Sequence, residues 1–313
     1  MTAAHPTIVV IGSANVDLTV KVERLPLVGE TVSGGDFRLA FGGKGANQAL
    51  AAQRAGAPVT LIAKLGRDPN GELLHQHLCV AGLRADGLLR DAETPSGVAL
   101  IMVDSQGRNL IAVAPGSNRR LTVAEVESLR SLAFTGRILL TQLETPLETV
   151  EYALRQGRAC GMLTILNPAP GRPLTSALLA LPDLITPNET EASLLTGIEV
   201  TGLDTARQAG EHLLGLGCRT VIITLGANGA LLLRQGAVQH FPAFPVTPVD
   251  STAAGDAFNG VLAVALLQGL PLERAILWAN AAGALSVTIR GAQESLPTRQ
   301  TIETLLQTHT ADG

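Results

Sequence analysis

Short runs of Val, Ile and Leu alternate along the chain with longer segments in which apolar residues recur at helical spacing. The short runs are almost continuously apolar, which is typical of parallel strands buried on both faces. They cover residues 7–12, 59–66, 137–143, 162–167, 183–188 and 220–226. Helical patterns lie between them, at residues 44–56, 70–82, 122–133, 146–160, 189–196 and 204–217. The alternation predicts an α/β fold in which helices cover a mostly parallel sheet.

Two segments break this alternation. Residues 15–41 read as strand, turn and strand, and residues 97–113 read as a β-hairpin with Gly107 in its turn. Because neither segment has a helical pattern, they predict a small β-sheet, either a lid or an ordinary extension of the main sheet edge. No repeat or shift in composition marks independent domains. We expect a main α/β body and a β lid, made respectively of residues 1–14, 42–96 and 114–313 and of residues 15–41 and 97–113.

Composition excludes several classes of protein. Of the 313 residues, 46% are hydrophobic, which is enough to bury a core that offsets the entropy cost of folding. A net charge of −4, no basic stripe and an aromatic content of 3% argue against nucleic acid as a partner. No apolar run is long enough to suggest a membrane span.

The cysteines and the start of the chain bear on the compartment. Cys79, Cys160 and Cys218 are far apart, which favours buried free thiols over disulfides or structural zinc. The chain starts with a strand-like run and shows no secretory signal. We therefore expect a cytoplasmic protein.

Polar side chains follow the ends of successive predicted strands. One such residue would be an ordinary helix cap, but carboxyl ends of parallel strands meet at one rim, where α/β proteins bind ligands. A series of them therefore predicts a binding site at that rim. They are Ser13, Asn15, Asp17, Glu144, Asn167, Asn188, Glu191 and Asp250, with a Gly-Ala-Asn-Gly turn at 226–229.

The segment Asp250–Asp256, Asp-Ser-Thr-Ala-Ala-Gly-Asp, precedes a helix that is predicted to begin near Ala254. Its small residues leave the N–H groups of Ala253, Ala254 and Gly255 open. Together with the positive end of the helix dipole, these donors suit a phosphate. An acid in the first turn either caps the helix or accepts a proton from an attacking hydroxyl, and the spacing alone leaves both roles open for Asp256.

A second glycine-rich segment, Phe41–Gln48, opens another predicted helix. Its glycines allow close approach of the backbone to a ligand, and Lys44 and Asn47 supply side-chain donors. The segment is not a Walker A loop, since Arg38 stands where that motif needs Gly and Gly45 where it needs Ser or Thr.

Three segments together resemble a known family. Residues 42–57, 186–197 and 250–260 are similar, in this order, to motifs of the phosphofructokinase B family of carbohydrate kinases, and the likeness extends from 9–17 to 291–297. It implies a ribokinase-like three-layer α/β/α fold whose small β lid also forms a homodimer. It further implies ATP-dependent phosphorylation of the 5-hydroxyl of D-ribose, with Mg²⁺ or another divalent cation and with K⁺ as activator.

The resemblance also implies roles for individual residues. Sugar contacts are implied for Asn15, Asp17, Gly42, Gly43, Lys44, Asn47, Glu144 and Asp256. The catalytic base would be Asp256, beside an anion hole of Ala253, Ala254 and Gly255. Nucleotide, phosphate and magnesium contacts are implied for Asn188, Glu191, Thr224, Gly226, Gly229, Gly255 and Asn280. A K⁺ site, partly of backbone carbonyls, is implied for Asp250, Thr252, Ser286, Ile289, Gly291 and Ser295.

Two departures and two alternatives accompany this resemblance. The family most often has Thr where Ser251 stands, so the hydroxyl is kept, and Ala253 and Ala254 replace the Gly-Ala pair of some relatives. The alternatives to a ribose kinase are a kinase for 2-deoxyribose, another sugar or a nucleoside, and a catalytically silent sugar- or nucleotide-binding protein. Because every catalytic group is present, the sequence favours an enzyme.

Overall fold

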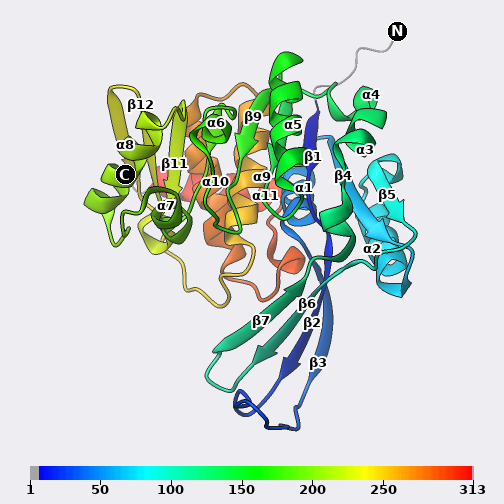
Figure 1. The fold of residues 1–313 in the computed structure, drawn as a ribbon. Helices are drawn as coiled ribbons and strands as arrows, with labels where there is room; N and C mark the ends of the chain where they lie inside the picture. Colours follow the sequence, from blue (N-terminus) through cyan, green and yellow to red (C-terminus); the bar gives the residue numbers. More distant parts are fainter. Residues whose placement is uncertain (1–6, 312–313) are drawn as a thin grey trace.

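A computed structural model describes residues 7–311; residues 1–6 and 312–313, which the sequence assigns to the main body, lie outside the described residues. The main sheet has nine strands in the order β13-β12-β11-β10-β9-β8-β1-β4-β5 (Figure 1). Their bounds are β1 Ile8–Ile11, β4 Val59–Gly66, β5 Leu88–Asp91, β8 Ile138–Thr141, β9 Leu163–Leu166, β10 Leu184–Ile185, β11 Thr220–Thr224, β12 Ala230–Arg234 and β13 Ala237–Phe241. Neighbouring strands are parallel except at β12 and β13, which add antiparallel at one edge.

Helices cover both faces of the main sheet. Alternate residues of a strand point to opposite faces, and β1 shows the result: Ile8 and Val10 pack in one core cluster, Val9 and Ile11 in another. The first cluster includes residues of α1 Lys44–Arg54, α2 Pro69–Val80, α9 Ala254–Leu267, α10 Leu272–Ser286 and α11 Arg299–Ala311. The opposite face is packed by α3 Val123–Ser128, α4 Arg130–Ala133, α5 Leu147–Ala159, α6 Ser176–Leu179, α7 Glu189–Thr196 and α8 Leu203–Gly215. The three-layer α/β/α fold is therefore confirmed.

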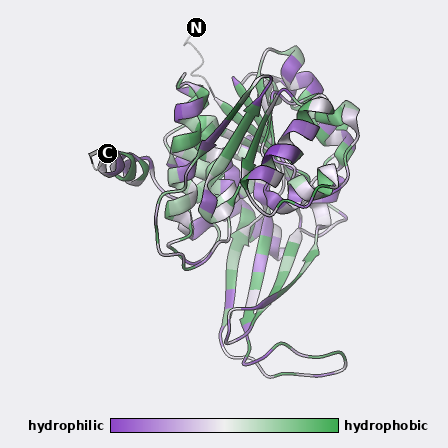
Figure 2. Cartoon of the chain, turned by 90° about the vertical axis from the view of Figure 1, so that its left-hand side faces the viewer, coloured by the Kyte–Doolittle hydropathy of each residue, from purple (hydrophilic) through white to green (hydrophobic). Residues whose placement is uncertain are grey.

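A second, four-stranded sheet projects from this body (Figures 1 and 2). Its order is β3-β2-β6-β7, with bounds β2 Asn15–Lys21, β3 Phe37–Gly42, β6 Gly97–Val103 and β7 Asn109–Ala114. All of β7 is exposed, and large apolar side chains of the sheet face solvent. They are Phe37, Leu39, Leu100, Leu110, Ile111 and Val113. The predicted small β-sheet is confirmed, and its apolar surface is available for contact.

Several predicted elements differ from the structure in their bounds. The helix expected at 122–133 is split at Leu129 into α3 and α4. Of the strand expected at 183–188, only β10 forms. Beyond it, the pairing is limited to a single bridge between Asn188 and Thr224. The helices α6, α10 and α11 and the strands β5 and β13 had no counterpart among the predicted elements.

The cysteines are free, as predicted, but the prediction that all three are buried is wrong. Only Cys218 is buried, whereas Cys79 is partly exposed and Cys160 is exposed just after the end of α5. Within the described part of the chain, no helix combines the length and the apolar character needed to cross a membrane.

Candidate active site

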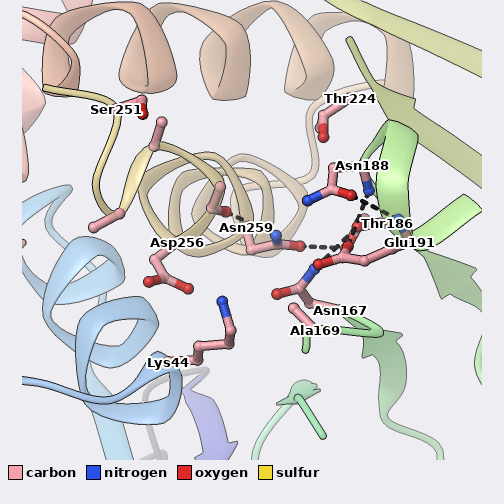
Figure 3. Close-up of a pocket in the computed structure, with 13 residues that line it drawn as sticks. Lys44, Asn167, Ala169, Thr186, Asn188, Glu191, Thr224, Ser251, Asp256 and Asn259 are labelled. Atoms are coloured by element: carbon pink, nitrogen blue, oxygen red, sulfur yellow. Dashed lines mark hydrogen bonds between the residues drawn. The ribbon is translucent and has the colours of Figure 1, made fainter. Parts of the chain in front are cut away.

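A polar pocket lies where the carboxyl ends of the central strands meet the start of α9 (Figure 3). Asn167 follows β9, Thr186 and Asn188 follow β10, and Thr224 ends β11. The structure thus brings the polar strand ends together at one rim. The lining consists of Lys44, Asn167, Ala169, Thr186, Asn188, Glu191, Thr224, Ser251, Ala253, Ala254, Gly255, Asp256 and Asn259.

The N-terminus of α9 opens into this pocket without a cap from its own side chains. Its N-cap is Ala253, which has a φ of 62° and, within residues 7–311, is the one non-glycine residue with positive φ. Such a conformation costs about 1–3 kcal/mol and persists where surrounding structure imposes it. A Cβ on Gly255 would meet no atom within 4 Å, so the space before the helix end is free. The N–H of Ala254, predicted to be open, donates to the carbonyl of Ser251 at 3.3 Å.

Asp256 is buried in the first turn of α9 and receives a donor on each carboxylate oxygen. Asn47 Nδ2 donates to Oδ2 at 2.9 Å, and Gln48 Nε2 donates to Oδ1 at 2.9 Å. The carboxylate is therefore held by α1, and no bond to it from the backbone of its own helix is present among the described residues. This geometry argues against the capping interpretation and leaves Asp256 oriented toward the pocket (Figure 3).

Lys44 extends its ammonium group into the pocket beside Asp256 (Figure 3). Burial would lower its pKa, but the carboxylates of Asp256, Glu144 and Glu191 outweigh that effect and raise the pKa. Glu144 in turn accepts bonds from the Lys44 backbone N–H, at 2.9 Å, and from the Ser13 hydroxyl. The lysine therefore stays charged, which suits the binding of an anion.

Asn188 and Glu191 form a capping box at the start of α7. The Glu191 N–H donates to Asn188 Oδ1 at 2.8 Å, and the Asn188 N–H donates to Glu191 Oε2 at 3.0 Å. Burial raises the pKa of Glu191, with Asp256 adding to the effect. Asn188 and Glu191 both line the pocket, and the carboxylate of Glu191 is a hard oxygen donor that fits Mg²⁺ bound with some of its waters.

A second cleft lies between the small sheet and the main body. Asn15 Oδ1 accepts a bond of 2.7 Å from Asn118. Its amide N–H groups have no acceptor within residues 7–311 and remain available as donors in the cleft. Burial raises the pKa of Asp17 to about 7, with Glu144 and Glu294 adding to it. The cleft is lined by Asn15, Val113, Pro115, Asn118, Arg119, Leu143, Glu144 and Pro170.

Two glycines before α1 allow close packing beside this cleft. A Cβ on Gly42 would lie 2.2 Å from Asp17 Oδ2, and one on Gly43, whose φ is 88°, would lie 2.6 Å from the Cα of Ala14. A side chain at Gly42 would clash with the Asp17 carboxylate, and one at Gly43 would clash with the backbone of Ala14, so both positions require glycine.

Of the residues expected at the nucleotide, only some line the pocket. Thr224 does, but Gly226, Gly229 and Asn280 do not. Asn280 Nδ2 donates to the carbonyls of Phe241 and Pro242, and a Cβ on Gly229 would lie 2.0 Å from the Phe241 oxygen. Both residues thus pack against the end of β13.

The residues expected to hold a monovalent cation meet where the loop before α9 joins the turn after α10. Asp250 Oδ1 accepts from the N–H and hydroxyl of Thr252, and Oδ2 accepts from the Gly291 N–H at 2.9 Å. Burial by itself would raise the pKa of Asp250. The hydrogen bonds from Thr252 and Gly291 and the charge of Arg290 outweigh burial, so the pKa is lowered. The hydroxyls of Ser286 and Ser295 donate to nearby backbone carbonyls. Asp250 therefore connects the two segments whether or not an ion binds.

Two further facts limit metal binding there. Ile289 has an exposed side chain, so it could act only through its backbone carbonyl. Over residues 7–311, no group of three or more His, Cys, Asp or Glu residues is arranged to hold a metal ion.

Sequence reasoning missed several buried amides around the site. Gln48 lies beside Asn47 in the glycine-rich segment and Gln142 ends a predicted strand, so both had a local signal. Asn118 and Gln293 had none, because their contacts are with residues distant in sequence.

Comparison with known proteins places the chain. The family model described as pfkB family carbohydrate kinase matches residues 5–299. The chain belongs to this family. It is 41% identical over 294 residues to a ribokinase of Haemophilus influenzae, covering 94% of this chain and 96% of that protein. It is 36% identical over 291 residues to a deoxyribokinase of Salmonella typhi, covering 93% and 95%.

The fold is also similar to that of solved structures. A structure of Arabidopsis thaliana ribokinase complexed with ribose and ATP superposes with a TM-score of 0.88 at 33% identity, covering 96% of this chain and 99% of that one. The ribokinase-like fold and the family predicted from the sequence are therefore confirmed, and the protein is a member of the pfkB family of carbohydrate kinases.

Proposed function

We propose that this carbohydrate kinase transfers the terminal phosphoryl group of ATP to the 5-hydroxyl of D-ribose, with Asp256 as general base. The observation that carries the proposal is the pairing of a fixed, buried carboxylate with an uncapped helix N-terminus in one pocket. Phosphoryl transfer needs both a proton acceptor for the attacking hydroxyl and donors for charge on the phosphoryl oxygens.

The reaction follows from these positions. Asp256 accepts the proton of the sugar hydroxyl, the hydroxyl oxygen forms a bond to the terminal phosphorus, and the bond from that phosphorus to the bridging oxygen breaks, releasing ADP. Backbone N–H groups of Ala253 and Gly255 and the Lys44 ammonium stabilise the charge on the transferred group, and the Ala254 N–H joins them when it gives up its bond to the Ser251 carbonyl. In this proposal Asn188 and Glu191 hold Mg²⁺ through water, and the ion would neutralise phosphate charge.

The cleft beside the small sheet is the proposed sugar end of the site. In the cleft Asn15 offers free amide donors and Glu144 offers acceptors, and Asp17, which interacts electrostatically with Glu144, is a further proposed acceptor; such groups suit a ring with several hydroxyls. Gly42, Gly43 and Asn47, at the end of β3 and the start of α1, are proposed to approach the sugar from outside the lining of this cleft. Since a buried partner left unpaired costs about 1–3 kcal/mol, a sugar lacking one hydroxyl should be a poorer substrate.

Nucleotide contacts and the small sheet complete the proposal. We assign the base and ribose of ATP to the region next to Thr224, toward Gly226, Gly229 and Asn280, which lie outside the lining of the pocket. The exposed apolar side chains of the small sheet support its role as a lid and as the surface of a homodimer.

K⁺ is the proposed activator at Asp250, Thr252, Ser286, Ile289, Gly291 and Ser295. The support is structural, since Asp250 connects this segment to the loop that carries the anion hole. Filling the site would then order that loop.

A substrate panel tests the function. Initial rates with ATP should show kcat/KM for ribose about tenfold or more above that for 2-deoxyribose, and negligible rates with nucleosides. Equal values for the two pentoses would favour the deoxyribose or broad-specificity alternative. No turnover with any sugar or nucleoside would leave a binding protein. Repeating the ribose assay in K⁺ and Li⁺ at equal ionic strength tests the cation, and Asp250→Ala should abolish any difference.

A further inference from the structure

Gln293 begins the short η4 helix, Gln293–Ser295, and lies between Gly291 and Ser295, two residues of the proposed cation site. Its side chain is 3% exposed and reaches Asn47 on α1, where its Nε2 donates to Asn47 Oδ1 at 3.1 Å. Asn47 then donates its own amide to Asp256 Oδ2. A chain of two hydrogen bonds therefore connects η4 with the proposed base.

The direction of these bonds is determined by their chemistry. An ionised carboxylate only accepts, so the Asn47 amide must present its NH₂ to Asp256, and its buried oxygen is then left for a donor on the other side. Gln293 is that donor. The oxygen of Gln293 is in turn paired with His77 Nε2 at 2.7 Å, which fixes the orientation of the glutamine amide if the imidazole donates from Nε2.

The backbone of η4 is held at the same helix. Arg54, at the end of α1, donates to the carbonyls of Gln293 and Leu296 at 2.6 and 3.0 Å. On the other side His77 stacks on Phe41 with ring centroids 3.9 Å apart. Gln293 is thus held by hydrogen bonds with Asn47, His77 and Arg54, which fix the orientation of its amide as well as its position.

The other carboxylate oxygen has a similar arrangement. Gln142 Nε2 donates to Gln48 Oε1 at 2.6 Å, and Gln48 Nε2 donates to Asp256 Oδ1. Each amide that contacts Asp256 is therefore oriented by a glutamine behind it. One of these glutamines directly follows strand β8, and the other lies in η4, where both Gln293 and Ser295 are buried.

We propose that Gln293 is a positioning residue, which orients the Asn47 amide and through it the carboxylate of Asp256. This inference rests on the proposed role of Asp256 as base. A misplacement of a reacting group by about 1 Å can cost about 10²-fold in rate, so loss of this donor should lower kcat while leaving ATP binding intact.

Two variants of Gln293 separate positioning from packing. Gln293→Leu keeps the volume but removes the donor, and kcat should fall about tenfold. Gln293→Glu keeps the shape but presents only acceptors when ionised, so the Asn47 amide should turn toward it and present its oxygen to Asp256. We expect a larger fall, about 10²-fold, for this variant. KM for ATP should stay within about twofold in both, as chemistry and not binding is changed.

Gln300→Leu and Gln300→Glu are matched controls, since Gln300 is exposed on the neighbouring α11. Both controls should keep the wild-type kcat. Melting temperatures are measured for all variants, and the rates are taken at saturating K⁺, so that weaker cation binding does not account for a loss.

The outcomes are distinct. A lower kcat at unchanged KM for ATP, with Glu worse than Leu at position 293, supports the proposal. A lower melting temperature with wild-type kcat, or equal losses in the Gln300 controls, overturns it. If Asp256→Asn is inactive while both Gln293 variants match wild type, only the positioning role fails. If Asp256→Asn is fully active, the proposed base fails, and the role of Gln293 fails with it.

Discussion

Two helices point their N-termini at the same pocket, and they satisfy their first N–H groups in opposite ways. The helix α7 caps itself, since the side chains of Asn188 and Glu191 pair with each other's backbone. The helix α9 has Ala253 as N-cap, which has no side chain able to accept a bond, in a conformation with positive φ. At α7 a side chain accepts the bond from the Glu191 N–H, whereas at α9 the Ala254 N–H makes one bond of 3.3 Å to the Ser251 carbonyl and the Gly255 N–H is left to a ligand.

The difference shows how one pocket can combine a fixed part with a receptive part. At α7 the carboxylate of Glu191 is held in place and can orient a hydrated cation. At α9 the space before Gly255 is empty, and a phosphate can receive the N–H groups and the dipole of a helix of 14 residues. Variants that fill, discharge or uncap these two helix ends should therefore have different consequences.

Filling the end of α9 should have the largest effect among these variants. Gly255→Ala places a methyl group where the phosphate would lie, and loss of such donors typically costs about 10²-fold in kcat. The fold should not suffer, because alanine is the better helix former by about 1 kcal/mol. Steady-state kinetics and thermal melting measure both. The control is Gly215→Ala in α8, also with no atom within 4 Å of the added Cβ, which should keep full activity. Unchanged kcat in Gly255→Ala would contradict an anion site there.

Removing the negative charge of Glu191 at the start of α7 should have a smaller effect on activity. Glu191→Gln retains an oxygen for the Asn188 N–H but removes the charge, so the Mg²⁺ concentration for half-maximal rate should rise about tenfold. Because burial raises the pKa of Glu191, the folded state binds its proton more tightly than the unfolded state does. Wild-type stability contributed by this group is therefore present at acid pH and lost as pH rises through the raised pKa. The stability of the variant relative to wild type, measured by urea unfolding, should therefore increase as pH rises from 4 to 7. An unchanged difference would contradict a raised pKa for Glu191 in the folded state.

Uncapping α7 should have the smallest effect. Asn188→Ala removes the acceptor for the Glu191 N–H, and loss of an N-cap typically costs about 1 kcal/mol of unfolding free energy. Thr175→Ala is a matched control, because Thr175 caps α6 outside the pocket in the same way. Both variants should lose similar stability in urea titrations, but only Asn188→Ala should also lose activity. Equal activity in the two would assign Asn188 a structural role alone.

The sequence predicted the fold well because the signals for it are local. The run Ile8–Ile11 is apolar throughout since it is buried on both faces, and β4 has the predicted bounds of 59–66. The break between α3 and α4 was missed because helical spacing continues across Leu129, which leaves helical geometry.

The site was predicted in part for the same reason. The segment before α9 has a compact local pattern, so its uncapped end could be anticipated. The contacts to Asp256 could not, because Asn47 and Gln48 lie 209 and 208 residues away in sequence. Only the packing of α1 against α9 brings them together, helped by Gly260, where a Cβ would lie 2.6 Å from that of Ala51.

The most direct test of the account is the rate of phosphoryl transfer by Asp256→Asn. Asparagine keeps the size of the side chain but cannot accept the hydroxyl proton, and a general base typically contributes about 10²–10⁴-fold in rate. Calorimetry should show that ATP and ribose still bind, and kcat measured with both at saturation should fall into that range. Binding retained with this loss is the predicted result; a kcat within about twofold of wild type would contradict Asp256 as the base.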